Sequence, residues 1–145
     1  AADAGAIAAD AKLFDPDTAL EDPLPPAGDY RCRTFKLGKL GTATQDFTAY
    51  PWSQCRITDE GEIKDVRTLT GSQRPNGLLF PESSARAIFL GTLVLGDETA
   101  PLRYGVDDKR DMIGYFERID AARWRLVFPR PTFESVLDVV EILPA

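Results

Sequence analysis

The chain has 145 residues, a length that suits one domain, and its composition is that of a globular protein, with 43% hydrophobic residues. The net charge of −6 argues against nucleic-acid binding, because attraction to phosphates needs a basic surface. The absence of histidine excludes a Ser-His-Asp or Cys-His catalytic set and a histidine zinc site within the chain. Two cysteines are too few for a structural zinc site, so we expect no metal and no cofactor. No apolar run is long enough to predict an integral membrane segment.

The N-terminal part of the chain divides into two segments before any strand is expected. Residues 1–14 are alanine-rich with apolar residues at helical spacing, which predicts a short N-terminal helix. Asp15-Pro16 ends it, because a residue before proline disfavours helix. Residues 15–28 contain four prolines and predict an extended connector.

Residues 29–145 form the predicted single β domain. Eight β-like runs follow one another, separated mostly by tight turn signals. This pattern predicts a mainly β fold, an antiparallel meander of about eight strands that forms a small barrel, lipocalin-like, or a sandwich. The runs are Asp29–Leu37, Phe47–Thr58, Ile63–Thr70, Gly77–Phe80, Ala85–Leu95, Met112–Ile119, Arg123–Phe128 and Val136–Leu143.

Two of these runs predict their surroundings. Alternation along Arg123–Phe128 predicts a half-buried strand whose outer face, with Arg123 and Arg125, is exposed to water. Ala85–Leu95 is apolar on both faces, which predicts that both are covered. We expect the N-terminal helix to be the lid over its outer face.

The two cysteines, Cys32 and Cys55, lie in neighbouring predicted strands. We expect a structural disulfide between them, which would close a loop of about 23 residues and contribute roughly 3–4 kcal/mol. The alternative is a pair of free thiols with pKa values lowered by neighbouring arginines. A disulfide favours an oxidising compartment, so the predicted location is periplasmic or secreted.

Two polar stretches are candidate binding loops. Thr70–Gly77 is glycine-rich with one cation, Arg74, and predicts either an anion site built from backbone N–H groups or a hairpin with Asn76-Gly77 at its tip. The stretch Gly96–Asp111 is acidic and long. It predicts a calcium site, a pair of catalytic carboxylates, or simply a solvated loop.

The aromatic residues also have two interpretations. They line a ligand cavity, or they fill the ordinary core of a small barrel. The set consists of Tyr50, Trp52, Phe89, Tyr104, Tyr115, Phe116, Trp124 and Phe128.

Several strings, taken together, indicate a family. They are Gly28-Asp29-Tyr30-Arg31-Cys32-Arg33, Tyr50-Pro51-Trp52, Leu69-Thr70-Gly71-Ser72-Gln73-Arg74-Pro75, Phe89-Leu90-Gly91-Thr92-Leu93-Val94-Leu95-Gly96-Asp97-Glu98, Arg110-Asp111-Met112, Arg123-Trp124-Arg125-Leu126-Val127 and Phe133-Glu134-Ser135-Val136-Leu137-Asp138. As a set they resemble DUF4893, an uncharacterised family of exported bacterial proteins, from about Asp15 to Pro144. The resemblance implies export and a single domain, and it carries no activity onto any residue. The general layout is also similar to small periplasmic barrels that inhibit proteases through an N-terminal segment.

We therefore rank three functions. The first is a non-catalytic envelope binding module for a small apolar or anionic ligand, held at a barrel mouth by Arg74, Tyr104, Asp97 and Asp111. The second is a protease inhibitor or protein-interaction module that uses the Pro-rich arm Asp15–Ala27. The third is a carboxylate-based hydrolase. The expected partner is a small-molecule ligand or an envelope protein, with no nucleic acid.

Overall fold

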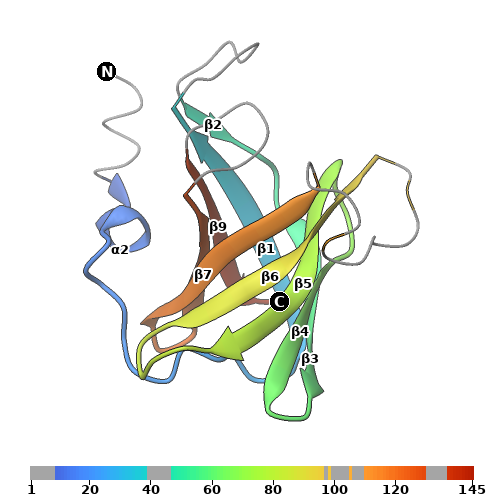
Figure 1. Cartoon of the computed structure of the whole chain (residues 1–145). Helices are drawn as coiled ribbons and strands as arrows, with labels where there is room; N and C mark the ends of the chain where they lie inside the picture. Colours follow the sequence, from blue (N-terminus) through green and yellow to red (C-terminus); the bar gives the residue numbers. More distant parts are fainter. Residues whose placement is uncertain (1–8, 39–46, 97, 99–104, 106–109, 130–136) are drawn as a thin grey trace.

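The computed structural model describes residues 9–38, 47–96, 98, 105, 110–129 and 137–145. Within these ranges one short helix precedes nine strands, of which all but β2 (Phe47–Ala49) form a barrel (Figure 1). The elements are α2 (Ala11–Phe14), β1 (Gly28–Leu37), β2 (Phe47–Ala49), β3 (Ser53–Glu60), β4 (Ile63–Thr68), β5 (Gln73–Pro81), β6 (Ala87–Leu95), β7 (Asp111–Asp120), β8 (Arg123–Phe128) and β9 (Leu137–Pro144). Among the described residues, none lies in a helix that is long and apolar enough to cross a membrane.

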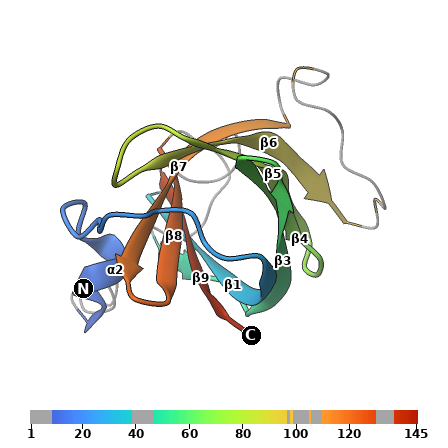
Figure 2. The same ribbon diagram turned by 90° about the horizontal axis from the view of Figure 1, so that it is seen from below.

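The strands close into an eight-stranded antiparallel barrel. From β3 to β9 each strand pairs with the next, and β1 pairs with both β3 and β9. The seam between the first and last barrel strands runs from Tyr30↔Pro144 to Leu37↔Leu137. Figure 2, a view from below, shows the ring of strands. The predicted meander is therefore confirmed, and it forms a barrel.

The run Phe47–Thr58 is broken into two strands. Phe35 of β1 faces Ala49 of β2, and Cys32 faces Ser53 of β3. Two residues of β1 thus oppose three residues of the partner segment, which is a β-bulge. Pro51 lies in the bulge and has no N–H to donate. β2 is consequently the continuation of β3 beyond an interruption.

The sequence interpretation of Asn76-Gly77 as a hairpin tip is wrong. Both residues lie in the middle of β5, where Gly77 faces Gly91 of β6. The Phe89 ring lies against this pair of glycines, since a Cβ on Gly77 would be 2.7 Å from its Cζ atom. The glycine is needed for close packing across the sheet.

One end of the barrel is filled with apolar side chains. The Phe89 and Phe128 rings meet edge to face at 5.5 Å, and the Tyr30 and Trp124 rings meet similarly at 5.6 Å. Leu24 of the connector packs against this core. The largest cluster comprises Tyr30, Cys32, Cys55, Ile57, Val66, Leu79, Ala87, Phe89, Phe116, Trp124, Leu126, Phe128, Val140 and Ile142.

The Pro-rich connector crosses the filled end of the barrel, as Figure 2 shows. Pro23 and Pro25 are buried, and the Tyr30 hydroxyl donates to the Pro26 carbonyl at 2.6 Å. The Arg118 guanidinium donates to the Glu21 carbonyl at 2.6 Å. In this structure the connector is packed against the barrel as its floor and does not project as an arm.

Helix α2 lies on the outer wall of the barrel, but away from the expected strand. Its Leu13 is buried with Phe35 of β1, Ile119 of β7 and Val139 of β9. It also covers Arg125 of β8, whose side chain is buried. The expected wet outer face of β8 is therefore wrong at this position, because the N-terminal segment covers it.

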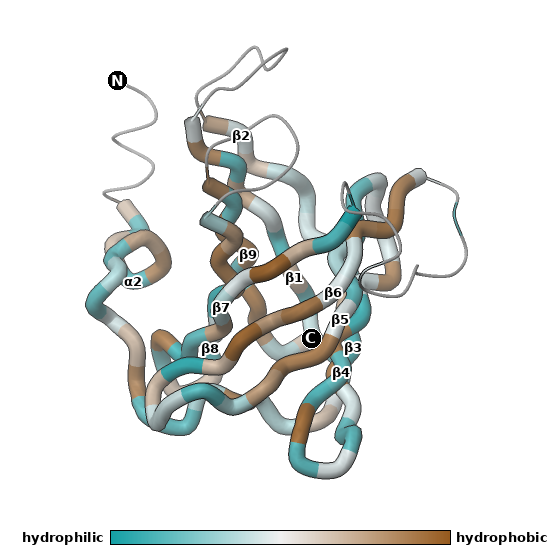
Figure 3. Tube along the Cα trace, in the orientation of Figure 1, coloured by the Kyte–Doolittle hydropathy of each residue, from teal (hydrophilic) through white to brown (hydrophobic). Residues whose placement is uncertain are grey.

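The outer face of β6 is not covered by α2. Its Ile88 and Leu90 are partly exposed, and their neighbour Ile113 of β7 is 59% exposed. Figure 3 shows brown segments, which mark hydrophobic residues, on β6 and β7 at the front of the barrel. The expectation that the N-terminal helix covers this strand is wrong for its described part, because the apolar residues of α2 pack beside Phe35 instead. Residues 1–8 of the expected helix lie outside the described residues.

Candidate ligand-binding cavity

A cavity of about 340 Å³ occupies the barrel end opposite the connector. This volume lies at the lower end of the range for small-molecule sites. The barrel strands that surround it contribute inward-facing residues from the ends of the strands away from the floor. The described residues that line it are Cys32, Thr34, Lys36, Tyr50, Pro51, Trp52, Ser53, Thr68, Thr70, Gly71, Ser72, Gln73, Pro75, Leu93, Met112, Phe128, Asp138 and Val140.

The deeper wall of the cavity is apolar. Leu93, Phe128 and Val140 are buried members of three different strands, and Met112 packs against the main core. Phe128 packs edge to face against Phe89 of the core. Because these side chains are fixed by core packing, they form a preformed apolar surface for a ligand.

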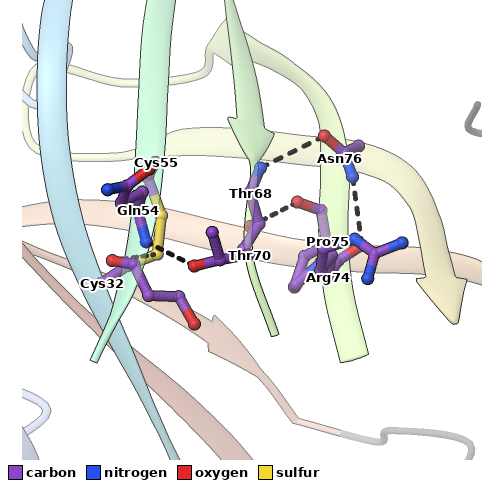
Figure 4. The surroundings of a disulfide bond; sticks show 9 residues. Cys32, Gln54, Cys55, Thr68, Thr70, Arg74, Pro75 and Asn76 are labelled. Carbon is purple, nitrogen blue, oxygen red and sulfur yellow. Dashed lines mark hydrogen bonds between the residues drawn. A yellow bond between two sulfur atoms is a disulfide. The ribbon is translucent and has the colours of Figure 1, made fainter. Parts of the chain in front are cut away.

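The disulfide between Cys32 and Cys55 reaches the cavity wall through Cys32. Both cysteines are buried, and their Cα atoms are 6.1 Å apart (Figure 4). This bond confirms the predicted bridge and leaves no free cysteine. It joins β1 to β3 directly below the bulge at Pro51, where the backbone pairing between these strands is interrupted.

Hydroxyl groups line the side of the cavity formed by the end of β4 and the residues that follow it. Figure 4 shows Thr68 and Thr70 beside the disulfide. The Thr68 hydroxyl donates to the Pro75 carbonyl at 2.7 Å, and the Thr70 hydroxyl accepts from the Gln54 N–H at 2.9 Å. These bonds fix both side chains. Further hydroxyls come from Thr34, Tyr50, Ser53 and Ser72.

One buried ion pair contributes the charged groups of the cavity wall. Lys36 of β1 and Asp138 of β9 are direct cross-strand partners, with Nζ and Oδ2 2.9 Å apart. Each side chain is only 7% exposed. Among the described lining residues these two alone are charged, and their formal charges cancel.

Trp52 stands at the rim of the cavity with two arginines against its ring. The guanidinium carbons of Arg31 and Arg33 lie 4.7 and 4.5 Å from the ring centroid. Arg33 also donates to Glu141 at 2.8 Å. Cation–π contacts of this kind hold an otherwise exposed tryptophan in place.

Comparison with protein families identifies the group to which this barrel belongs. Residues 1–142 match the domain of unknown function DUF4893. The chain belongs to this family. No curated protein and no solved structure matches it. The family has no assigned function, so the cavity of this DUF4893 protein is interpreted from its own residues.

The structure places two of the four residues predicted to bind a ligand in this DUF4893 protein, and neither lines the cavity. Arg74 of β5 donates to the carbonyls of Gly96 at 2.7 Å and Glu98 at 2.8 Å, which ties neighbouring loops together. Asp111 of β7 accepts from the Gly105 N–H at 2.9 Å. Their role in binding stays a prediction. Asp97 and Tyr104 lie outside the described residues.

The two candidate loops differ in their relation to the cavity. The first, Thr70–Gly77, contributes five residues to the lining, from Thr70 to Pro75. In the second, Glu98 accepts from Arg110 at 2.7 Å, and this bond chiefly lowers the pKa of Glu98. Within the described part of the chain, no group of three or more potential ligands could hold a metal ion.

Lys36 and Asp138 were not singled out by the sequence analysis, although a signal existed. Lys36 follows Cys32 and Thr34 at a spacing of two, on the inward face of β1. Asp138 precedes Val140 and Ile142 in the same way on β9. A charge at the inward position of each of two alternating strands predicts a buried pair, provided that the strands are known to be neighbours.

Proposed function

We propose that this DUF4893 protein is a non-catalytic binding module of the cell envelope that holds a small, largely apolar ligand in its barrel-end cavity. The observation that carries the proposal is the cavity itself, with an apolar depth and convergent hydroxyl groups. The disulfide supports an exported location, because such bonds persist in oxidising compartments. The mouth of a β-barrel is also a common place for ligands in all-β proteins.

The two alternative functions have less support. An inhibitory arm needs a projecting connector, whereas Pro23 and Pro25 are buried against the barrel. A glycoside hydrolase needs two carboxylates about 5–10 Å apart across a cleft. Among the described lining residues Asp138 is the only carboxylate, and it is paired with Lys36. Neither alternative is favoured by an observation of its own.

The test uses a neutral fluorescent probe, N-phenyl-1-naphthylamine, whose emission rises in apolar surroundings. Thr34→Phe would fill the cavity from β1. Thr58→Phe makes the same change at an exposed position of β3 outside the lining, and it serves as the matched control. We expect saturable binding by the wild type and by Thr58→Phe, and its loss in Thr34→Phe. Equal binding by all three proteins, or binding by none, would overturn the proposal.

A second measurement identifies the natural ligand. Native mass spectrometry of the protein purified from its own envelope should show a bound mass that disappears on denaturation. The same preparation of Thr34→Phe should lack that mass, while Thr58→Phe should retain it. A bound mass that Thr34→Phe also carries would place the ligand elsewhere on the molecule.

A further inference from the structure

We propose that the ligand is an uncharged amphipathic molecule, an apolar body with a hydroxyl, carbonyl or amide head, and that the Lys36–Asp138 pair makes the cavity reject ions. This inference rests on the proposed function and narrows it to one chemical class. The sequence predicted an apolar or an anionic ligand; the present inference keeps the apolar ligand and excludes the anionic one.

The first step is the position of the pair. Lys36 and Asp138 face each other across the seam between β1 and β9, and both line the cavity. With 7% of each side chain exposed, water screens the pair very little. Inside the barrel the pair therefore acts as a neutral dipole, and the described residues of the cavity wall offer a ligand no net charge.

The second step is the effect of a charged ligand. A carboxylate could approach Lys36 only in competition with Asp138, which would take from a buried carboxylate its ammonium partner 2.9 Å away. An ammonium group would do the same to Lys36. Separating a buried pair is strongly unfavourable, because neither partner regains its hydration. Either ion would therefore bind more weakly than a neutral molecule of the same shape.

The third step is the fit of a neutral head group. The remaining polar side chains of the lining include the hydroxyls of Thr34 and Ser53 and the amide of Gln73. Hydroxyl and amide groups both donate and accept hydrogen bonds, so they match an alcohol, a carbonyl or an amide. The apolar body of such a ligand would lie against Phe128 and Val140.

The experiment compares three molecules with the same eight-carbon chain: 1-octanol, octanoate and octylammonium. Each displaces N-phenyl-1-naphthylamine from the wild-type protein at about pH 7, where the acid and the amine are both charged. We expect 1-octanol to bind at least about tenfold more tightly than either ion, because only the ions disturb the buried pair. Octanoate or octylammonium binding as tightly as 1-octanol would overturn the inference.

Two variants test whether the pair causes this ranking. Asp138→Asn leaves Lys36 without its carboxylate. The affinity for octanoate should therefore rise by about tenfold or more relative to the affinity for 1-octanol. Lys36→Met removes the ammonium group beside Asp138, so the affinity for octylammonium should rise relative to the affinity for 1-octanol. Circular dichroism and the intact disulfide verify the fold of each variant. Folded variants that keep the wild-type ranking would show that the pair plays no part in selection.

The outcomes separate the two proposals. If no eight-carbon molecule displaces the probe and Thr34→Phe binds it as the wild type does, the proposed function fails. If displacement occurs but octanoate is the strongest competitor, only the present inference fails. Should the single variants not fold, the wild-type ranking alone decides, since it needs no substitution.

Discussion

Arg125 of β8 and Glu117 of β7 form an ion pair on the outer wall of the barrel, with Nε and Oε1 3.0 Å apart and both side chains at most 3% exposed. The same guanidinium donates to the carbonyls of Leu13 at 3.0 Å and Asp15 at 2.5 Å. One arginine therefore neutralises a buried carboxylate and holds the C-terminal end of α2. A cation is electrostatically favourable at this end of a helix.

Replacing Arg125 should be costly for this reason. Arg125→Met leaves Glu117 buried with Arg86, which is partly exposed, as its one cationic partner among the described residues. We expect the free energy of unfolding to fall by about 3–5 kcal/mol. Urea denaturation followed by tryptophan fluorescence measures the change. The control is Lys12→Ala, which removes an exposed pair with Asp120 and should cost less than about 1 kcal/mol. Equal effects of the two substitutions would contradict this account.

The disulfide should stabilise the barrel mainly by restricting the unfolded chain. It closes a loop between residues 23 positions apart. The double variant Cys32→Ala/Cys55→Ala should therefore lose roughly 3–4 kcal/mol of unfolding free energy. Intact mass measured before and after reduction checks the bond, because reduction adds two hydrogen atoms. A double variant as stable as the wild type would show that the loop is already restricted in the unfolded state.

Gly91 should tolerate no side chain. A Cβ there would lie 2.7 Å from the Cα of Gly77 and 2.8 Å from Cζ of Phe89. Since backbone must move, Gly91→Ala should cost about 3 kcal/mol or more in thermal or urea unfolding. Gly61 offers the contrast, with φ of +70° and open space around it. Gly61→Asn should cost less than about 1 kcal/mol, because asparagine tolerates this conformation.

Tyr30 should make the protein sensitive to alkali. Burial raises its pKa above the ordinary 10.0, so the folded protein holds the proton at pH values where the unfolded chain has lost it. The stabilisation is complete below pH 10.0 and is lost as pH rises through the folded pKa. Tyr30→Phe should show a shallower loss of stability above that pH, measured by urea denaturation at a series of pH values.

The same variant has a cost at neutral pH that serves as its control. It removes the hydroxyl bond to the Pro26 carbonyl, so it should be about 0.5–1.5 kcal/mol less stable than the wild type. The two curves should therefore converge as the pH rises. Parallel curves would show that Tyr30 does not titrate differently in the folded and unfolded states.

Local patterns in the sequence predict the strands but not every interruption. Alternation along Arg123–Phe128 correctly places Trp124 inside, because the period of two is a property of the strand alone. Asn76-Gly77 misleads, since its glycine is required by the Phe89 ring on the next strand. The burial of Arg125 depends on a segment 110 residues away, which no local pattern contains.

The candidate site is predicted less completely than the fold. The disulfide follows from a count of two cysteines and their place in neighbouring strands. Residues of the candidate loop Thr70–Gly77 do line the cavity. The Lys36–Asp138 pair, by contrast, joins residues 102 positions apart. The pair can be predicted only when the first and last barrel strands are known to be neighbours, and local sequence patterns do not contain that information.

That seam sets the order in which the chain can complete its fold. Because β1 must wait for β9, the barrel has no closed form until the chain has been delivered as far as Pro144. A nascent or translocating chain would carry two unpaired strand edges, which invite aggregation. Such distant pairing also slows folding. The barrel therefore gains its last row of backbone hydrogen bonds only when β9 has joined β1.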